Sequence, residues 1–288
     1  MAKIRKVVLP VAGLGTRMLP ATRVLPKEML PVVDKPIVQY AVEEAMASGI
    51  EEIILVSGRG KSLIEDHFDR AVELFETLAR RGRRAELQRL LAQTPEPGAI
   101  VATRQQEPKG LGHAVWCARH LVGREPFAVV LVDDLIDAPV PCLAQMIAVH
   151  ERTGGNVVAV VEVPRDHTSR YGIVAPGADD GRVVEIRGLV EKPAPDAAPS
   201  RLAVIGRYIL LPEVMDELAR HEIGAGGEIQ LTDAMARLIG RQPFHGLRFE
   251  GRRFDCGDRL GYLEAIVALA AKRPDIGPAF REILARYS

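Results

Sequence analysis

The sequence predicts an α/β fold with a mainly parallel sheet, and three observations support this prediction. The apolar runs of the chain are short and rich in valine and isoleucine, which favours strands. Several of these runs lack polar alternation, so both faces of the sheet are expected to be covered. Segments with helical periodicity separate the runs, and this alternation is typical of parallel sheets.

The first half of the chain contains most of this pattern. Strands are expected at residues 6–11, 52–57, 100–104, 127–132 and 156–163. Helices are expected between them, at residues 36–48, 62–91, 111–119 and 141–151. Pro36 suits a first helical position and Gly49 a C-terminal stop. The segment 62–91 has room for two helices, and its arginine-rich run is most simply a solvated face.

The pattern changes after residue 163. Residues 171–174, 182–190 and 202–210 are strand-like, and loops containing glycine and proline separate them. Residues 260–271 and 278–286 are expected to form closing helices. We find no repeat and no linker long enough to separate domains. The prediction is therefore a single domain, residues 1–288, in which the second half adds strands to the same sheet.

Composition excludes several classes of partner. The 288 residues include 38 basic and 38 acidic side chains, so no overall field attracts nucleic acid or an anionic membrane. No stretch reaches the roughly 18 apolar residues that span a bilayer. The apolar start contains Pro10 and Gly13, which is unlike a signal peptide. Three widely spaced cysteines suit a reducing compartment, so we expect a cytoplasmic location without nucleic-acid or membrane partners.

The most informative segment is 9–36, LPVAGLGTRMLPATRVLPKEMLPVVDKP. A strand leads into glycines, which let backbone N–H groups approach phosphate oxygens. Arg17 adds a planar donor fork and Lys27 a mobile point charge. The glycine turn alone could equally be a plain tight turn, because it lacks both the Walker GK[ST] and the spacing GxGxxG.

The whole segment, with GxGTR, PKxxLPV and DKP in order, resembles the signature of the sugar-1-phosphate nucleotidylyltransferases. In detail it is similar to the bacterial branch that uses UTP and glucose 1-phosphate. The resemblance continues through GLGHAVWCAR (110–119), LVDDLI (131–136), YGIV (171–174), LVEKP (189–193), GAGGEIQLTDAM (224–235) and RFDCGDRLGYLEA (253–265). It implies a Rossmann-like nucleotidyltransferase fold with a sugar-binding elaboration in the second half. Residues 1–163 would mainly bind nucleotide and 164–257 sugar phosphate, with C-terminal helices at 258–288.

For the nucleotide, the resemblance implies Ala12, Gly13, Gly15, Thr16, Arg17, Lys27, Gln105 and Gly110. The glycine turn would hold the triphosphate, and Lys27 would lie near the reacting phosphates. Gln105 and Gly110 match positions that read the edge of the base; the alternative for Gln105 is an exposed strand end. We expect His113, in the same segment, to have a structural role near the nucleotide.

Asp133 and Asp255 match the family's two metal ligands, and the implied metal is Mg²⁺. Ligands of α/β sheets gather at the carboxyl ends of strands, where Asp133 is expected. This sequence departs from the family by having Val132 before that residue and Asp134 after it. We favour Asp133 as the ligand and place Asp134 near the sugar hydroxyls; the alternative for the pair is a helix cap or turn.

For the sugar phosphate, the resemblance implies Asp134, Gly172, Glu191, Lys192 and Glu228. Glu191 could accept hydrogen bonds from sugar hydroxyls, and Lys192 could neutralise the phosphate. A bare EKP triplet is usually a surface turn, and Glu228 could instead be an acidic residue in the first turn of a helix.

The implied reaction takes UTP and glucose 1-phosphate to UDP-glucose and pyrophosphate by Mg²⁺-assisted in-line attack on the α-phosphate. Arg17, Lys27 and Asp133 would carry the catalysis. No general base is needed, because a phosphate monoester with a second pKa of about 6 is mostly dianionic at neutral pH. We expect a ternary complex without a covalent intermediate.

Other interpretations remain open. Thymidylyl, adenylyl or guanylyl transfer to another sugar phosphate would use the same chemistry, because a methyl group is discriminated by only about 1–3 kcal/mol. A sugar-nucleotide-dependent glycosyltransferase and a non-catalytic sugar-nucleotide sensor are further alternatives. The resemblance also suggests a homo-oligomer, a dimer or a tetramer.

Overall fold

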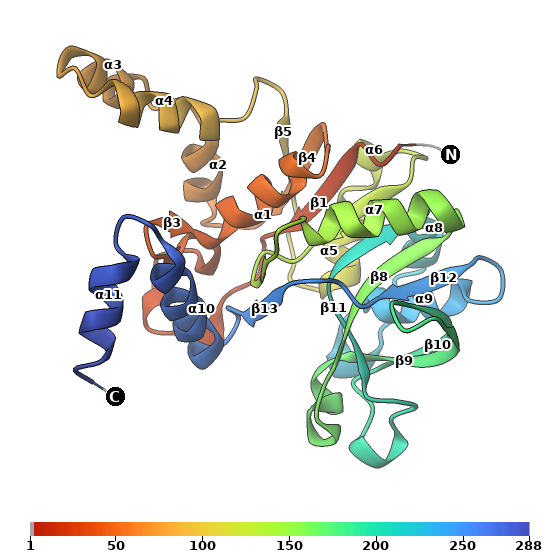
Figure 1. Ribbon diagram of the computed structural model, residues 1–288. Coiled ribbons are helices and arrows are strands. Elements are labelled where there is room, and N and C mark those ends of the chain that lie inside the picture. Colours follow the sequence, from red (N-terminus) through yellow and green to blue (C-terminus); the bar gives the residue numbers. More distant parts are fainter. Residues whose placement is uncertain (1–2, 288) are drawn as a thin grey trace.

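The computed structural model describes residues 3–287, and a nine-stranded sheet forms its centre (Figure 1). Across this sheet the strands lie in the order β5-β4-β1-β6-β11-β8-β12-β10-β9. Their bounds are β1 (Lys6–Pro10), β4 (Glu52–Ser57), β5 (Ile100–Arg104), β6 (Phe127–Val130), β8 (Asn156–Glu162), β9 (Gly172–Asp179), β10 (Val183–Glu191), β11 (Leu202–Leu210) and β12 (Phe244–Leu247).

The sheet is mixed, and its parallel part is concentrated in the first half of the chain. β1 pairs in parallel with both β4 and β6, and β4 does so with β5. In the second half only β12 is parallel to its neighbour β8. β11 is antiparallel to β6 and β8, and β10 is antiparallel to β9 and β12. Strands from both halves therefore share one sheet, as the sequence predicted.

Both faces of the sheet are buried, which confirms the expectation from the apolar runs. Alternate strand residues enter two separate cores: Val8 belongs to one, whereas Val7 and Leu9 belong to the other. The first core includes side chains of α5 (Leu111–Cys117), α6 (Arg119–Val122), α8 (Val214–Leu218) and α9 (Leu231–Leu238). The second includes side chains of α1 (Ile37–Ala47) and α7 (Cys142–Thr153).

The predicted helical region 62–91 is three helices rather than one or two. They are α2 (Ser62–Phe68), α3 (Val72–Arg80) and α4 (Arg84–Gln93). The chain breaks at Asp69, whose backbone is extended, and again near Gly82, which has a φ of 67°. Figure 1 shows α3 and α4 projecting together from the body of the molecule.

A third, smaller core closes the molecule beside α1. The hairpin β2 (Pro31–Val32) and β3 (Lys35–Pro36) packs with α10 (Arg259–Lys272), which α11 (Gly277–Leu284) follows (Figure 1). The short antiparallel pair β7 (Asp134–Asp137) and β13 (Arg252–Asp255) joins this core through Leu135 and Phe254. Within residues 3–287, no helix is long and apolar enough to cross a membrane.

Several predicted boundaries were wrong. β6 ends at Val130 rather than residue 132, because the chain turns there towards β7. β9 extends to Asp179 instead of ending at 174, since it pairs along most of β10. The predicted helix 111–119 divides into α5 and α6 at Ala118. The prediction missed β2, β3, β7, β12, β13, α8 and α9.

Candidate active site

Two adjoining cavities open where the parallel strands β1, β5 and β6 reach their carboxyl ends. The first cavity, of about 460 Å³, is lined by Pro10, Ala12, Gly13, Leu14, Gly15, Thr16, Lys27, Gln105, Pro108, Gly110, Leu111, Ala114, Leu131, Asp133 and Glu228. The second, of about 410 Å³, is lined by Arg17, Leu111, Leu131, Asp133, Asp134, Arg170, Tyr171, Gly172, Glu191, Lys192, Val204, Ile205, Gly206, Tyr208, Glu228, Gln230, Leu231, Thr232, Arg253 and Asp255. They share a wall formed by Leu111, Leu131, Asp133 and Glu228.

The glycine turn after β1 brings the backbone close to Lys27. Gly15 has a φ of 67°, a conformation that favours glycine. A Cβ at this position would also lie only 3.1 Å from the Cβ of Lys27 and 3.2 Å from Cγ2 of Thr22. A residue beyond the turn also stabilises it, because the Thr22 hydroxyl donates a hydrogen bond to the Gly15 carbonyl at 2.7 Å. The absence of a side chain at Gly15 thus leaves room for Lys27 to line the first cavity beside the glycine turn.

Lys27 and Asp133 form an ion pair at the seam between the two cavities. Lys27 Nζ lies 2.5 Å from Asp133 Oδ2, and the two side chains are 20% and 21% exposed. Burial alone would lower the pKa of Lys27, but the charges of Asp133 and Glu28 outweigh it and raise that pKa. Burial likewise disfavours the Asp133 carboxylate, yet Lys27 keeps the pKa of Asp133 below its ordinary value. Both groups are therefore charged at neutral pH.

Asp133, Asp255 and Arg17 converge on the space in front of Gly257. A Cβ added at Gly257 would lie 2.7 Å from Arg17 Nη2, 3.0 Å from Asp133 Oδ2 and 3.0 Å from Asp255 Oδ1. Two carboxylate oxygens border this space, so a divalent cation would bind here once the Arg17 guanidinium, whose Nη2 lies beside it, turns towards substrate phosphates. Among residues 3–287, no group of three or more His, Cys, Asp and Glu side chains could hold a metal alone. Further ligands would have to be substrate oxygens or water, as Mg²⁺ commonly uses.

Both carboxylate oxygens of Asp134 already have protein partners, which favours Asp133 as the metal ligand. Its Oδ1 accepts a hydrogen bond from Arg253 Nε at 2.6 Å, and its Oδ2 accepts one from the Gly206 N–H at 2.9 Å. Burial raises the pKa of Asp134, and Arg253 only partly offsets this effect. Burial also opposes the charge of Arg253, but the Asp134 carboxylate outweighs it and raises the pKa of Arg253. Asp134 thus holds Arg253 in the wall of the second cavity.

A buried arginine supports the turn that carries Asp133. Arg207, on β11, is 1% exposed and donates to Glu44 of α1, with Nη2 2.7 Å from Oε2. Its remaining hydrogens reach the carbonyl oxygens of Leu131 at 3.0 Å and Asp134 at 2.8 Å, on either side of Asp133. A third carbonyl, that of Gly206, accepts at 3.0 Å. The guanidinium fork therefore fixes both ends of the 131–134 turn against the sheet.

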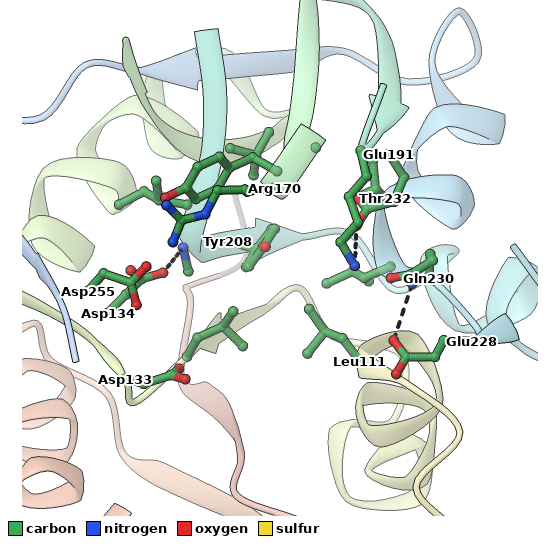
Figure 2. Close-up of a pocket in the computed structure, with 18 of the residues that line it drawn as sticks. Leu111, Asp133, Asp134, Arg170, Glu191, Tyr208, Glu228, Gln230, Thr232 and Asp255 are labelled. Atoms are coloured by element: carbon green, nitrogen blue, oxygen red, sulfur yellow. Dashed lines mark hydrogen bonds and ion pairs between the residues drawn. The ribbon is translucent and has the colours of Figure 1, made fainter. Parts of the chain in front are cut away.

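The second cavity has acidic groups at both ends (Figure 2). Figure 2 shows Asp133, Asp134 and Asp255 at one end and Glu191 and Glu228 at the other, with Tyr208 between them. Lys192 Nζ lies 3.5 Å from Glu191 Oε1, and the Lys192 side chain is 43% exposed. Lys192 has a φ of 47°, which is rare for a residue other than glycine and is often found at functional sites.

The Glu228 segment packs against Gly110, and both residues line the first cavity. A Cβ at Gly110 would lie 2.7 Å from the Glu228 Cβ and 2.9 Å from the Ile229 carbonyl oxygen. Glu228 accepts a hydrogen bond from Gln230 Nε2 at 3.3 Å. Its interpretation as a residue in the first turn of a helix was wrong, because α9 begins only at Leu231.

The structure brings together all the site residues expected from the sequence. Seven of the eight expected nucleotide residues line the first cavity, and the eighth, Arg17, lines the second. All the expected sugar-phosphate residues and both expected metal ligands line the second cavity. Gln105 is buried rather than an exposed strand end. Their individual roles remain predictions.

The sequence interpretation missed other residues that line the second cavity, among them Arg170, Tyr171, Tyr208, Thr232 and Arg253. Three of them lie within the motifs quoted above: Tyr171 in YGIV, Thr232 in GAGGEIQLTDAM and Arg253 in RFDCGDRLGYLEA. Arg253 is two residues before Asp255 on β13, so the two side chains share one face of that strand. Arg170 immediately precedes the YGIV motif. Nothing in the sequence indicated that Tyr208 belongs to the site, because it lies within the continuous apolar strand β11.

Comparisons with known proteins show the family of the chain and its fold. The family model described as "Nucleotidyl transferase" matches residues 6–272. A UTP–glucose-1-phosphate uridylyltransferase of Komagataeibacter xylinus is 53% identical over 257 residues, which cover 89% of this chain and 90% of the relative. A UTP-bound UGPase from Acinetobacter baumannii superposes with a TM-score of 0.91 at 40% identity, covering 99% of this chain and 100% of that one. A UDP-glucose pyrophosphorylase complexed with UDP-glucose gives a TM-score of 0.84 at 40% identity, covering 94% and 100%.

Proposed function

Because the chain belongs to the nucleotidyl transferase family, we propose that it forms UDP-glucose and pyrophosphate from UTP and glucose 1-phosphate. The observation that carries the proposal is the pair of cavities that meet at Asp133. A transfer reaction needs two substrates in contact at one atom, and a shared wall between two cavities provides such a place.

UTP occupies the first cavity in this proposal. Its phosphates lie along the glycine turn near Lys27, where backbone N–H groups and the ammonium can bind them. Its uracil lies against Gln105 and Gly110, whose amide and backbone groups can pair with the base edge.

Glucose 1-phosphate occupies the second cavity. Glu191, at the end of β10, accepts hydrogen bonds from sugar hydroxyls, and Lys192 beside it neutralises the phosphate. Arg253, whose Nη2 lies 3.6 Å from Asp255 Oδ2, also lines this cavity, as does Arg170, and both add positive charge on the side nearer Asp255 (Figure 2). Asp134 serves the sugar indirectly, since its carboxylate is already bound to Arg253.

Asp133 and Asp255 would hold a divalent metal, which members of the family generally use and which we propose to be Mg²⁺. When bound, the metal neutralises charge on the reacting phosphates. Lys27, now paired with Asp133, is placed to move to the phosphates of UTP. Arg17 faces the same space and can stabilise charge that develops on the departing pyrophosphate.

The chain supplies position and charge rather than a base. A phosphate oxygen of glucose 1-phosphate attacks the α-phosphorus of UTP, the bond from that phosphorus to the β-phosphate bridging oxygen breaks, and pyrophosphate leaves from the opposite side. The attacking phosphate is already mostly dianionic at neutral pH, so no proton has to be removed. From the sequence resemblance we further propose a cytoplasmic homodimer or homotetramer.

The test is a substrate panel. Purified protein with Mg²⁺ is incubated with each of UTP, dTTP, ATP, GTP and CTP against glucose 1-phosphate, and pyrophosphate and nucleotide sugar are both measured. The proposal predicts fastest turnover with UTP and no uridylylated protein after incubation with UTP alone. Faster turnover with another triphosphate would contradict the choice of UTP. An isolated covalent intermediate would contradict the direct transfer.

A further inference from the structure

The amide group of Gln105 has a defined orientation in the first cavity. Gln105 is 8% exposed and follows β5. Its Nε2 donates to the carbonyl oxygen of Gly110 at 3.1 Å and to Nδ1 of His113 at 3.0 Å. An amide nitrogen carries two hydrogens, and these two acceptors use both. Oε1 is therefore the atom of this side chain that remains available to a ligand in the cavity.

His113 can accept this hydrogen bond only in one protonation state. Its Nδ1 must carry no proton, so the ring is neutral and its hydrogen is on Nε2. The ring is buried within α5, stacked on Trp116 at 5.9 Å and met edge-on by His221 at 5.7 Å.

The surroundings of His113 favour the neutral ring. Burial lowers the pKa of His113 most, and the charges of His221, Lys109 and Arg119 lower it further, while Glu107 opposes them. Besides these groups, Cys117 lies 4.0 Å away on the same helix, and burial raises the pKa of its thiol, so it stays uncharged.

We infer that His113 orients the Gln105 amide so that the first cavity accepts a hydrogen bond from the nucleobase and thereby selects uracil over cytosine. The inference rests on the proposed function, since it concerns the base of the triphosphate. Uracil offers N3–H at its pairing edge, whereas cytosine offers an unprotonated N3. Oε1 therefore forms a hydrogen bond with uracil and opposes another acceptor in cytosine.

Protonation of His113 removes this fixed orientation. A proton on Nδ1 turns the ring nitrogen into a donor that faces the Gln105 nitrogen. A half-turn of the amide would satisfy this donor but would set Oε1 against the Gly110 carbonyl oxygen, so neither orientation satisfies both neighbours and the amide is no longer fixed. The preference for uracil over cytosine then declines. Thymine offers the same N3–H as uracil, so discrimination between UTP and dTTP does not depend on His113.

The experiment measures dissociation constants for UTP, CTP and dTTP by isothermal titration calorimetry with Mg²⁺ between about pH 8 and about pH 5.5. The ratio of the CTP dissociation constant to the UTP dissociation constant is compared at each pH. Protonation of the triphosphate affects both constants equally and therefore cancels in this ratio. We expect this ratio to fall in the wild-type protein as the pH decreases below the ordinary histidine pKa of about 6.5. The UTP to dTTP ratio stays constant.

Two variants separate orientation from packing. His113→Asn keeps an acceptor, Oδ1, close to the position of Nδ1 and cannot be protonated, so it retains the preference for UTP over CTP at every pH. His113→Phe keeps the ring volume without an acceptor, so the preference falls by about tenfold at every pH. The wild-type titration and His113→Asn remain decisive if His113→Phe does not fold.

His67→Asn is a matched control, because His67 also contacts a glutamine, Gln39, at 2.9 Å, but lies outside both cavities. It leaves the wild-type ratios and their pH dependence unchanged. Tight UTP binding with a CTP to UTP ratio that neither pH nor His113→Phe alters would overturn this inference and leave the proposed function intact. Failure to bind UTP at all would overturn both.

Discussion

Gly257 keeps the space between Asp133, Asp255 and Arg17 open because it has no side chain. It follows Cys256, whose N–H donates to the Asp133 carbonyl at 2.7 Å, so the turn after β13 is held against the turn after β6. The Gly257 N–H also donates to Asp255 Oδ1 at 3.0 Å and fixes that carboxylate. A methyl group added at position 257 would therefore occupy the space between the two carboxylates.

Gly257→Ala is expected to raise the Mg²⁺ concentration needed for half-maximal pyrophosphate release by about tenfold or more, because the new methyl would contact both carboxylates. Thermal unfolding should change little, since the backbone of Gly257 has no positive φ. Gly188→Ala is the control, with its Cβ 3.3 Å from that of Ala175, outside both cavities. An unchanged Mg²⁺ requirement in Gly257→Ala would refute the assignment of this space.

Asp133→Asn removes one charge from the seam between the cavities. We expect pyrophosphate release to fall by about 10²-fold or more, because Lys27 loses its partner and the metal loses a ligand. Asp216→Asn, which removes an exposed carboxylate paired with Arg124, should keep wild-type activity. Activity in Asp133→Asn within about twofold of that control would show that Asp133 has no part in the reaction.

At the scale of elements, the continuous apolar strands were the most predictable part of the fold. β4, β5 and β11 have the bounds expected from the sequence, since each is a continuous strand of the large sheet. The strands β7, β12 and β13 were missed because each has only four residues, and β7 and β13 also contain two or more charged side chains. Pairing with distant segments, rather than local pattern, stabilises such strands.

Site residues were likewise predictable where a local sequence motif identifies them and unpredictable where their role depends on distant contacts. The residues named from the recognised motifs line the two cavities, but Tyr171, Thr232 and Arg253 lie in the same motifs and were not named. Arg207 could not be predicted, because its function depends on contacts with Glu44, 163 positions away, and with Asp134, 73 positions away. In the sequence it appears only as one charge within an apolar strand.

Arg207→Met should lower the free energy of unfolding by about 3–5 kcal/mol, because it leaves Glu44 buried without a cation. Urea denaturation measures the loss. The double variant Arg207→Met with Glu44→Met removes both charges and should recover much of it. If the single and double variants are equally unstable, the ion pair is not the cause.

At the scale of the whole molecule, the two cavities at the carboxyl ends of the parallel strands bring together residues as distant in sequence as Gly13 and Asp255. The chain as a whole carries a formal net charge of zero, with 38 basic and 38 acidic residues. Acidic and basic groups nevertheless concentrate in the second cavity. Local placement, rather than overall charge, therefore equips the protein to bind anions.

Three histidines in separate parts of the fold make its stability depend on pH. Burial lowers the pKa of His67 on α2, His113 on α5 and His245 on β12. A folded-state pKa below the unfolded value means that the unfolded chain binds protons first as the pH falls. The histidine contribution to stability is therefore complete above about pH 6.5 and is lost as the pH falls through the folded-state values.

We expect the urea midpoint to decrease between about pH 7.5 and about pH 5.5. His67→Asn and His245→Asn combined should reduce this decrease, because two of the three titrating groups are gone. Replacement of the exposed His120 on α6 by asparagine should leave it unchanged. A pH dependence identical in the combined variant and the wild type would contradict this explanation.

Because the two cavities share only one wall, most substitutions that line one cavity leave the lining of the other unchanged. Apart from Glu228, every residue of the first cavity comes before position 134, and apart from Arg17 and Leu111, every residue of the second comes after position 130. Under the proposed function, the residues that select the base and those that select the sugar therefore lie in successive stretches of the sequence. Substitutions in the second cavity would then change the sugar without changing the base, whereas substitutions in the shared wall would affect both.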